Sequence, residues 1–345
     1  MSKDLSESNN PWRLPIVVGE RPLVLLGTNT DYDNLNYLRA FEVDYFSSVA
    51  ALFCDEFEHT EDQGQRSKCA TAIRSTYGHA IESLMAIIGA ATQAPHGVGL
   101  WLNEYTLRDL RHVVSCVRNS TPAYFKLTTK QNQLTDGKSR LTWNELSNLV
   151  HSHCQAWDAD KRTRISDGFA SFWQRVSSDF MDEHQQREYN SIKHGVRVRP
   201  GGFTLRITPE RTFGVIDESA TSHISGGKYG TTYLTTELFN GRPKHCKRVR
   251  HDSVVWDPRA LIQRLQLVSM SIQNIMSALR LAVYKDVKPD GTGCLFRAPV
   301  DHGAWTDCWR RPNTFRSRFS DEFGTIESDF PTKAEVLKAY SQGSW

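Results

Sequence analysis

Apolar residues recur at helical spacing over much of this chain. From Leu35 onwards they return at three- and four-residue steps, the period of one face of an α-helix. This spacing predicts helices over about 35–52, 67–92, 103–118, 142–157 and 161–180. The following stretch, up to Gly195, either extends the last of these helices or forms a new one from Asp182. The pattern is therefore that of a helix-rich chain.

Two helix boundaries are marked by specific residues. Thr142 and Glu145 have the T-x-x-E spacing of a capping box, in which each side chain bonds a backbone N–H that the helix leaves unused. Gly195 suits the left-handed position just past a helix end, because a residue without a Cβ adopts it at little cost. These residues predict a helix start at 142 and a helix end before 195.

Beyond Gly195 the pattern changes to alternation. Residues 198–217 predict a β-hairpin, and residues 226–239 fit a third strand. Asp257 and Pro258 then open a long helix. The predicted fold class is mainly α, a helical bundle with a small antiparallel β-insert before a long final helix. Its predicted parts are an N-terminal arm (1–30), the bundle (31–200), the hairpin insert with a basic loop (201–255), the long helix packing back on the bundle (256–288) and a C-terminal extension (289–345) with one short helix.

Composition narrows the class of protein. The 345 residues are 39% hydrophobic and 23% charged, with a net charge of +3, so nucleic-acid binding must rest on local patches. No apolar run approaches the roughly 18 residues that a membrane-spanning helix needs, and the N-terminus lacks the apolar core of a signal peptide. Seven scattered cysteines without a C-x-x-C pair predict reduced thiols. We therefore expect a cytoplasmic protein that makes no use of a membrane.

The sequence "REYNSIKHG", residues 187–195, is the strongest candidate for chemistry. On a helix, Arg187 and His194 point within about 20° of one another and lie roughly 10 Å apart along the axis. Asn190 lies between them, within about 40° of His194. A cation and an amide can hold a phosphate, and imidazole exchanges protons near neutral pH. The alternative is a solvated helix end, where cations also favour the helix dipole.

This stretch resembles the signature of the HEPN superfamily (higher eukaryotes and prokaryotes nucleotide-binding domains), an arginine followed after four to six residues by a histidine. The resemblance implies a HEPN-like bundle and a metal-independent RNA endonuclease, a hydrolase that needs no cofactor and usually forms a homodimer. In this scheme His194 transfers protons, Arg187 clamps the phosphate and Asn190 positions it. The implied setting is prokaryotic antiviral defence or toxin–antitoxin growth control, with RNA as substrate and a second copy or a larger defence complex as partner.

One departure from the family keeps a second interpretation open. The commonest spacing would place the arginine where Tyr189 stands. Together with the β-insert and the tail, this favours a catalytically inactive HEPN-like module that binds RNA, a nucleotide or a partner protein. A third interpretation is a structural subunit whose motif is only a capped surface helix.

Glu82 is the fourth candidate catalytic residue. It stands within the otherwise apolar stripe of the second predicted helix, where a buried carboxylate is costly without a partner. It could face Arg187 or His194 and orient the site, or it could lie at the edge of the stripe and reach solvent. The sequence leaves these alternatives open.

A basic stretch, residues 241–251, is the candidate contact for an RNA backbone. It reads as a loop beside the hairpin, although exposed basic loops are common without such a role. The predicted RNA-binding residues are Lys193, Arg242, Lys244, Lys247, Arg248 and Arg250. His151, His153 and Cys154 stand close in sequence, with His151 and Cys154 one helical turn apart, but a fourth ligand is not evident, so no metal site is predicted.

Overall fold

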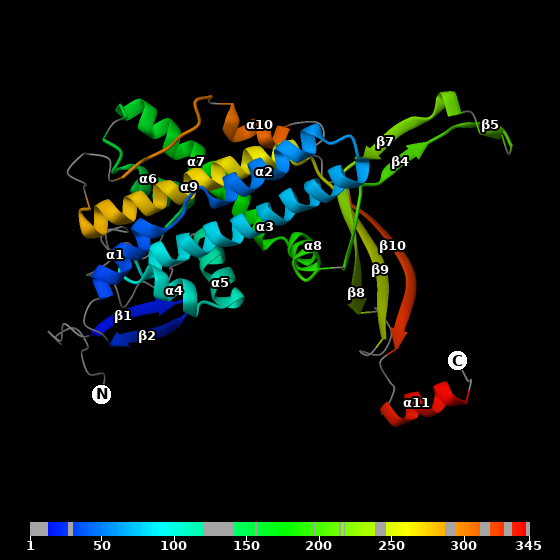
Figure 1. Ribbon diagram of the computed structural model, residues 1–345, viewed down its shortest axis with the longest axis horizontal. Coiled ribbons are helices and arrows are strands. Elements are labelled where there is room, and N and C mark those ends of the chain that lie inside the picture. The colour runs from blue at the N-terminus through cyan, green and yellow to red at the C-terminus, as the bar shows by residue number, and fades with distance from the viewer. Residues whose placement is uncertain are drawn as a thin grey trace. The chain divides into compact units, whose positions relative to one another are not determined.

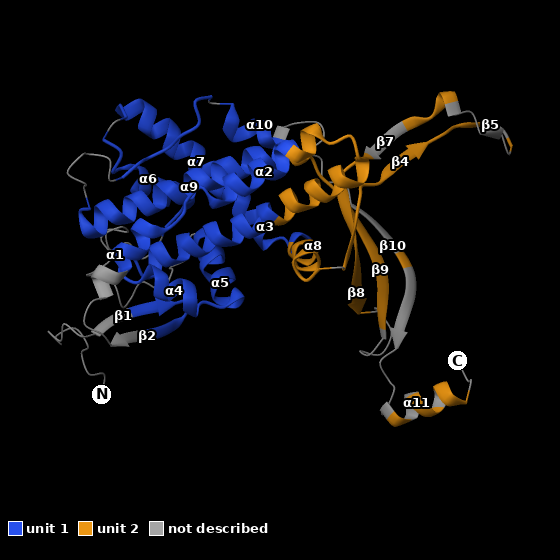
Figure 2. Ribbon diagram, in the orientation of Figure 1, with its two compact units in different colours: residues 1–55, 76–185, 259–310 blue, residues 56–75, 186–258, 311–345 orange. Residues whose placement is uncertain are grey.

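The computed structural model is mainly helical with small antiparallel sheets, which confirms the predicted fold class at this level (Figure 1). It describes residues 13–26, 30–119, 141–155, 157–195, 197–213, 215–216, 218–238, 246–286, 294–301, 303–310, 318–327 and 333–342. The chain divides into two compact units (Figure 2). Unit 1 comprises residues 1–55, 76–185 and 259–310, and unit 2 comprises residues 56–75, 186–258 and 311–345. The predicted domain boundaries, which group the residues differently, stay a prediction.

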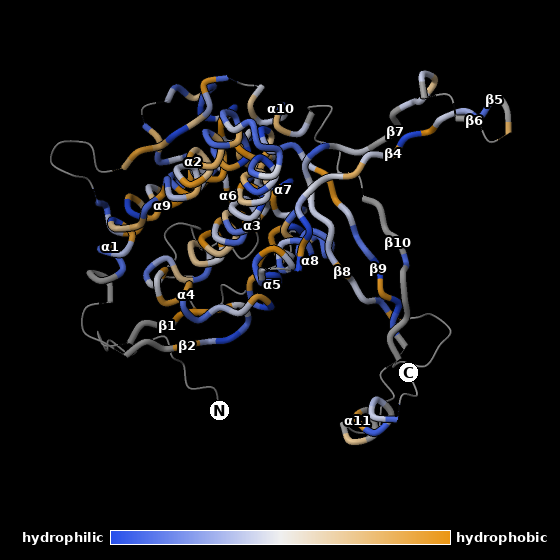
Figure 3. The backbone as a smooth tube through the Cα atoms, turned by 45° about the vertical axis from the view of Figure 1, so that its right-hand side comes forward, coloured by the Kyte–Doolittle hydropathy of each residue, from blue (hydrophilic) through white to orange (hydrophobic). Residues whose placement is uncertain are grey.

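Unit 1 is built mostly from helices. They are α1 (Thr30–Ala40), α2 (Tyr45–His59, continuing into unit 2), the second half of α3 (Gln63–Gln93), α4 (Val98–Glu104), α5 (Leu107–Arg118), α6 (Trp143–His151), α7 (Ala159–Met181), α9 (Pro258–Tyr284) and α10 (Ala304–Arg310). On α9, Leu265, Ile272 and Leu279 are fully buried at seven-residue spacing, as a core-facing stripe requires. Figure 3 shows hydrophobic positions distributed along this helix. The buried stripe is what holds α9 within the bundle.

Several predicted helix boundaries are confirmed and others are wrong. The capping box at Thr142 is present, with Thr142 Oγ1 accepting from the Glu145 N–H at 3.1 Å. A new helix, α8 (Glu183–Lys193), follows Asp182, whose carboxylate accepts the His184 N–H at 2.8 Å. The helix predicted over 35–52 is instead two helices, because the chain leaves helical geometry over 41–44. The helix predicted to reach 157 ends at His151.

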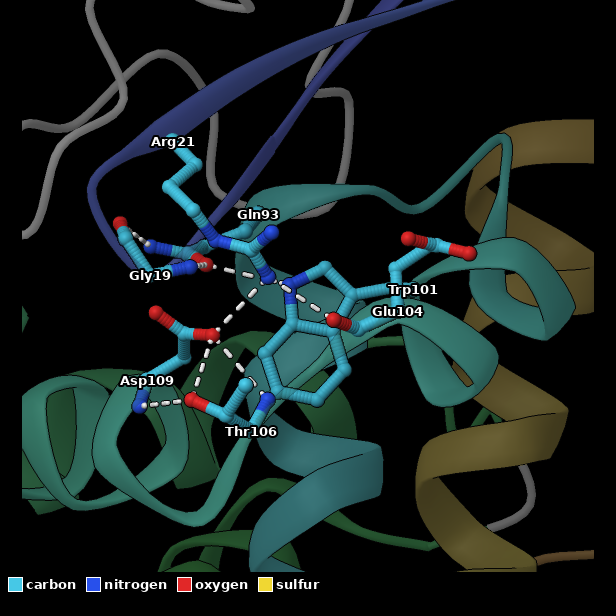
Figure 4. A network of polar contacts seen from close by, with 7 residues as sticks. All are labelled: Gly19, Arg21, Gln93, Trp101, Glu104, Thr106 and Asp109. Atoms are coloured by element: carbon cyan, nitrogen blue, oxygen red, sulfur yellow. Dashed lines mark hydrogen bonds and ion pairs between the residues drawn. The ribbon is translucent and has the colours of Figure 1, made fainter.

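The predicted N-terminal arm is a β-hairpin, β1 (Arg13–Val18) paired with β2 (Arg21–Leu26). Its turn is tied to the helices of unit 1 (Figure 4). The Gly19 N–H donates to Gln93 Oε1 and the Gly19 carbonyl accepts from Gln93 Nε2, each at 2.9 Å. The same Gln93 oxygen accepts the Trp101 indole N–H at 3.0 Å. Side-chain hydrogen bonds therefore fix a segment that the sequence predicted only as extended.

Unit 2 contains a four-stranded antiparallel sheet in the order β10-β9-β8-β3. Its strands are β3 (Val198–Pro200), β8 (Gly230–Leu238), β9 (Cys246–Val255) and β10 (Arg318–Glu327). Two further pairs, β4 (Thr204–Ile207) with β7 (Ser222–Gly226) and β5 (Glu210–Thr212) with β6 (Val215–Ile216), form what we call the β-ribbon. The short 3-10 helix η2 (Glu218–Ala220) lies between β6 and β7.

The sheet corrects three sequence predictions. The hairpin predicted over 198–217 is wrong as a single unit, because β3 pairs with β8 and β4 with β7. The basic stretch is not a loop from Cys246 onwards, because those residues form β9; residues 241–245 lie outside the described residues. The tail contributes the unpredicted strand β10, whereas its predicted short helix is confirmed as α11 (Lys333–Ser341). The third strand predicted over 226–239 is confirmed as β8.

Within the described residues, no helix combines the length and the apolar character needed to cross a membrane.

Candidate nucleic-acid interface

Helix α8 carries the motif of residues 187–195. It stays helical through the motif, because the His194 N–H donates to the Asn190 carbonyl at 3.0 Å. It ends at Lys193, and Gly195, two residues later, has a φ of +63° and donates to the Ile192 carbonyl at 3.0 Å. The helical period therefore brings Arg187, Asn190 and His194 to one side. Asn190 and His194 are exposed, and the Arg187 side chain is 40% exposed.

Glu188, which is not among the predicted site residues, anchors this helix. Its carboxylate is fully buried and accepts from Thr231 Oγ1 and from Trp256 Nε1, each at 2.9 Å. The Arg74 guanidinium, itself buried, donates to the second carboxylate oxygen at 2.6 Å. A buried carboxylate is tolerated when its lone pairs and its charge are matched in this way. The three partners fix the rotation of α8 about its axis, so that the opposite side keeps the motif residues outside.

Arginines and glutamates lie side by side next to α8. Glu237 of β8 pairs with Arg187 at 3.5 Å and with Arg250 of β9 at 3.2 Å. Arg248 of β9 pairs with Glu322 of β10 at 3.4 Å. The strand register places Thr235 opposite Arg250 and Glu237 opposite Arg248, so these groups share one face of the sheet. The buried carboxylate of Asp252 lies on the same face of β9, so this face carries charges of both signs.

The structure brings together only part of the predicted RNA-binding set. Arg248 and Arg250 lie on the face that α8 contacts. Lys247 is exposed on the opposite face, because neighbouring residues of a strand alternate. Lys193 is exposed, with its Nζ 5.6 Å from the centre of the Tyr189 ring. Arg242 and Lys244 lie outside the described residues.

Glu82 lies on α3 within unit 1, whereas Arg187 and His194 belong to unit 2. It is partly exposed. Burial, and secondly the nearby Glu82 carboxylate, raise the pKa of the Tyr105 hydroxyl. The idea that Glu82 orients the motif stays a prediction.

His151, one of the three residues considered as metal ligands, is structural. Its Nδ1 lies 2.7 Å from the Ser147 carbonyl and its Nε2 lies 3.1 Å from the Asn274 amide nitrogen. The Ser147 carbonyl can only accept and the amide nitrogen can only donate, so the ring is neutral with its hydrogen on Nδ1. Burial lowers the pKa of His151 to about 4. Among the described residues, no three His, Cys, Asp or Glu side chains are grouped as metal ligands would be.

Comparisons with protein-family models, with curated proteins and with solved structures find no match to this chain. A guanidinium and an amide on one side of a helix can bind a phosphate, and an exposed imidazole on that side can transfer a proton. The Glu237 carboxylate competes with a phosphate for Arg187 and Arg250.

Proposed function

We propose that the protein is a HEPN-like, metal-independent endoribonuclease whose reaction is carried by α8. The observation that supports this best is the fixed orientation of the helix. Buried Glu188 holds one side of α8 inside unit 2, while Arg187, Asn190 and His194 lie on the side that reaches solvent. Catalysis by positioning needs this combination, because the reacting groups must be accessible while their scaffold is rigid.

The proposed reaction is attack of a ribose 2′-hydroxyl on its own 3′-phosphate. A bond forms from the 2′ oxygen to phosphorus, and the bond from phosphorus to the 5′ oxygen of the next nucleotide breaks. His194 takes the 2′ proton, and a protonated imidazole returns one to the leaving 5′ oxygen. Arg187 stabilises the charge of the phosphorane and Asn190 positions a phosphate oxygen. The products are a 2′,3′-cyclic phosphate and a 5′-hydroxyl.

A homodimer, or a larger defence complex, is the proposed assembly. In a symmetric dimer the second copy would supply the imidazolium that donates to the leaving oxygen. The proposed setting is prokaryotic antiviral defence or toxin-type growth control. Sedimentation of the purified protein with and without RNA tests the assembly separately from the chemistry.

Cleavage of an RNA pool in excess EDTA tests the reaction. The wild-type protein should produce 2′,3′-cyclic phosphate ends, and His194→Ala should slow cleavage by about 10²- to 10⁴-fold, the usual contribution of a general acid or base. His59→Ala is a matched control, because this exposed histidine of the same unit lies at the end of α2, outside the motif and outside the basic stretch. Undiminished cleavage by His194→Ala would end the catalytic proposal.

The second candidate function is RNA binding without cleavage. It is favoured by the pairing of Arg187 and Arg250 with Glu237, which a phosphate would have to displace. In this case the RNA pool stays intact, binding weakens with salt, and Arg248→Glu with Arg250→Glu lowers the affinity. The two candidates therefore differ in the state of the RNA after incubation.

A further inference from the structure

The β-ribbon exposes apolar and basic side chains together. All four residues of β4 are exposed, with Leu205 and Ile207 on one side of the strand and Arg206 on the other. Phe213, between β5 and β6, is 99% exposed. A large aromatic side chain at a hairpin tip, together with two exposed aliphatic residues on the adjoining strand, contributes nothing to a core of its own unit. This composition is better explained by a contact made with another molecule.

The ribbon is held firmly where it leaves the sheet. The Gly202 N–H donates to the Lys228 carbonyl at 3.1 Å, and the Gly227 N–H donates to the Phe203 carbonyl at 2.8 Å. Gly226 has a φ of +120°, and a Cβ at this position would lie 2.1 Å from the Phe203 carbonyl oxygen. The close approach of the segments at Phe203 and Gly226 therefore requires glycine at position 226. Figures 1 and 3 show the ribbon extending away from the four-stranded sheet of the same unit.

The charge around the ribbon indicates the chemistry of its partner. Exposed cations follow the ribbon and the strand that leads into it: Arg197, Arg199, Arg206 and Lys228. Over residues 197–229 the sequence has five Lys or Arg against three Asp or Glu, and of these acids Glu210 is exposed. A surface with several cations and an aromatic tip suits a polyanion that carries flat rings. Single-stranded RNA has both, because its phosphates pair with arginine and its unstacked bases stack on aromatic rings.

From this we infer that the β-ribbon binds single-stranded RNA, with Phe213 stacking on a base and Arg206 contacting the backbone. The inference rests on the proposed function, since it takes RNA as the substrate class. It adds a binding surface separate from the motif helix. β3 and the Gly201–Gly202 turn lie between the end of α8 and the start of the ribbon, so both belong to one continuous stretch of unit 2.

Fluorescence anisotropy with a labelled single-stranded RNA tests the aromatic contact, in the His194→Ala background so that the RNA stays intact. Phe213→Ala should weaken binding by about five- to a hundredfold, the loss expected for one stacked base, and Phe213→Trp should retain the affinity. Because Phe213 is almost fully exposed, its replacement should leave folding intact. Leu238→Ala, at another exposed apolar residue of unit 2, is the matched control and should bind as the background protein does.

The salt dependence of binding tests the charged contact. Arg206→Gln should reduce the slope of log affinity against log salt by about 0.7, as one lost phosphate contact does on a single strand. Lys338→Gln, at an exposed cation of α11, should leave the slope unchanged. An unchanged slope for Arg206→Gln, or an unchanged affinity for Phe213→Ala, would overturn the inference.

Two further outcomes separate the alternatives. If Phe213→Ala converts a dimer to a monomer in sedimentation while RNA affinity stays the same, the ribbon is a protein interface and the inference is wrong. If the wild-type protein leaves RNA intact but Phe213→Ala still weakens binding, the proposed nuclease function fails and the ribbon inference stands. Cleavage that depends on His194 with no effect of Phe213 on affinity gives the reverse result.

Discussion

A neutral polar cluster is buried in unit 1 and an ionic one in unit 2. In unit 1, His151 connects Ser147 of its own helix with Asn274 of α9, and none of these three residues is charged. In unit 2, the Glu188 carboxylate is matched by Arg74 and receives two further hydrogen bonds. Both clusters satisfy their buried polar atoms. They differ in how much free energy is lost when one member is removed.

The difference follows from how much apolar surface each helix offers. Helix α6 buries Trp143, Leu146 and Val150, so its hydrogen bonds only add to apolar packing. Among its residues α8 has only Tyr189 and Ile192 as large apolar side chains, and both remain partly exposed. A helix whose side chains are mostly polar offers little apolar surface for packing against the rest of its unit. A charged anchor is therefore the main attachment of α8, and the predictions below test this contrast.

Removing the anchor should give the largest effect. Glu188→Ala leaves the Arg74 guanidinium buried without its carboxylate and should lower the free energy of unfolding by about 3–5 kcal/mol. Urea denaturation followed by tryptophan fluorescence measures the loss, and hydrogen exchange of the α8 amides locates it. The double variant Arg74→Met with Glu188→Leu removes both charges and should recover most of the stability. A loss below about 1 kcal/mol for Glu188→Ala would show that Glu188 is not the main attachment of α8.

The neutral cluster should respond to pH. The pKa of His151 is lowered to about 4 by burial, so the unfolded chain binds a proton at higher pH than the folded chain does. The contribution of His151 to the free energy of unfolding is therefore fully present above the unfolded pKa of about 6.5. It falls by about 3 kcal/mol as the pH drops to 4. Burial also lowers the pKa of His153, which acts in the same direction.

Urea denaturation at a series of pH values measures how the free energy of unfolding changes with pH. His151→Gln should be less stable at neutral pH, and its stability should fall less across the window than that of the wild-type protein. The remaining slope comes from His153 and, towards pH 4, from Asp109 and Asp286, whose pKa values are lowered in the folded protein. A wild-type protein whose stability stays constant between pH 6.5 and 4 would show that His151 is not held neutral.

A single hydrogen bond to the anchor should have an intermediate effect. Thr231→Val keeps the shape of the side chain but removes the donor to Glu188, and should cost about 2 kcal/mol, as bonds to charged groups do. Thr232→Val is the neighbouring control, since it loses only a bond to the Ser253 hydroxyl at 2.8 Å. Equal losses in the two variants would mean that the charge of Glu188 adds nothing to its hydrogen bonds.

The exposed pairs should contribute least to stability. Glu237→Gln removes the carboxylate shared by Arg187 and Arg250, and should change the free energy of unfolding by less than about 1 kcal/mol. RNA affinity should rise, because the two arginines lose their competing partner. Anisotropy titration measures this gain, and a weaker affinity would argue against both arginines as phosphate contacts.

Local sequence signals predicted much of the fold. The capping box at Thr142, the helix end at Gly195 and the new helix after Asp182 each depend on residues within a few positions, so the chain alone reveals them. The strand β9 was missed because the lysines and arginines of its first half suggested a loop, although Arg248, Arg250 and Asp252 alternate with other residues as a strand requires. The alternation alone does not distinguish a strand from a loop; the pairing of β9 with β8 and β10 makes these residues a strand.

The anchor could not be predicted in the same way. Glu188 accepts hydrogen bonds from Arg74, Thr231 and Trp256, which come from three distant parts of the chain. No local sequence pattern predicts contacts between residues so far apart. One signal was present. Glu188 and Ile192 are four residues apart, so the carboxylate shares a helical side with the aliphatic residue most expected to face inward.

The bond between Gly19 and Gln93 has a consequence for how the chain tolerates mutation. The Gln93 amide offers its donor to the Gly19 carbonyl and its acceptor to the Gly19 N–H, as a neighbouring strand would. Asparagine is one methylene too short to reach, and glutamate would set a carboxylate oxygen against the carbonyl. A saturation library at position 93, selected for folded protein, should therefore return glutamine far more often than any other residue. The geometry of the β1–β2 turn therefore restricts which residue the chain tolerates at position 93.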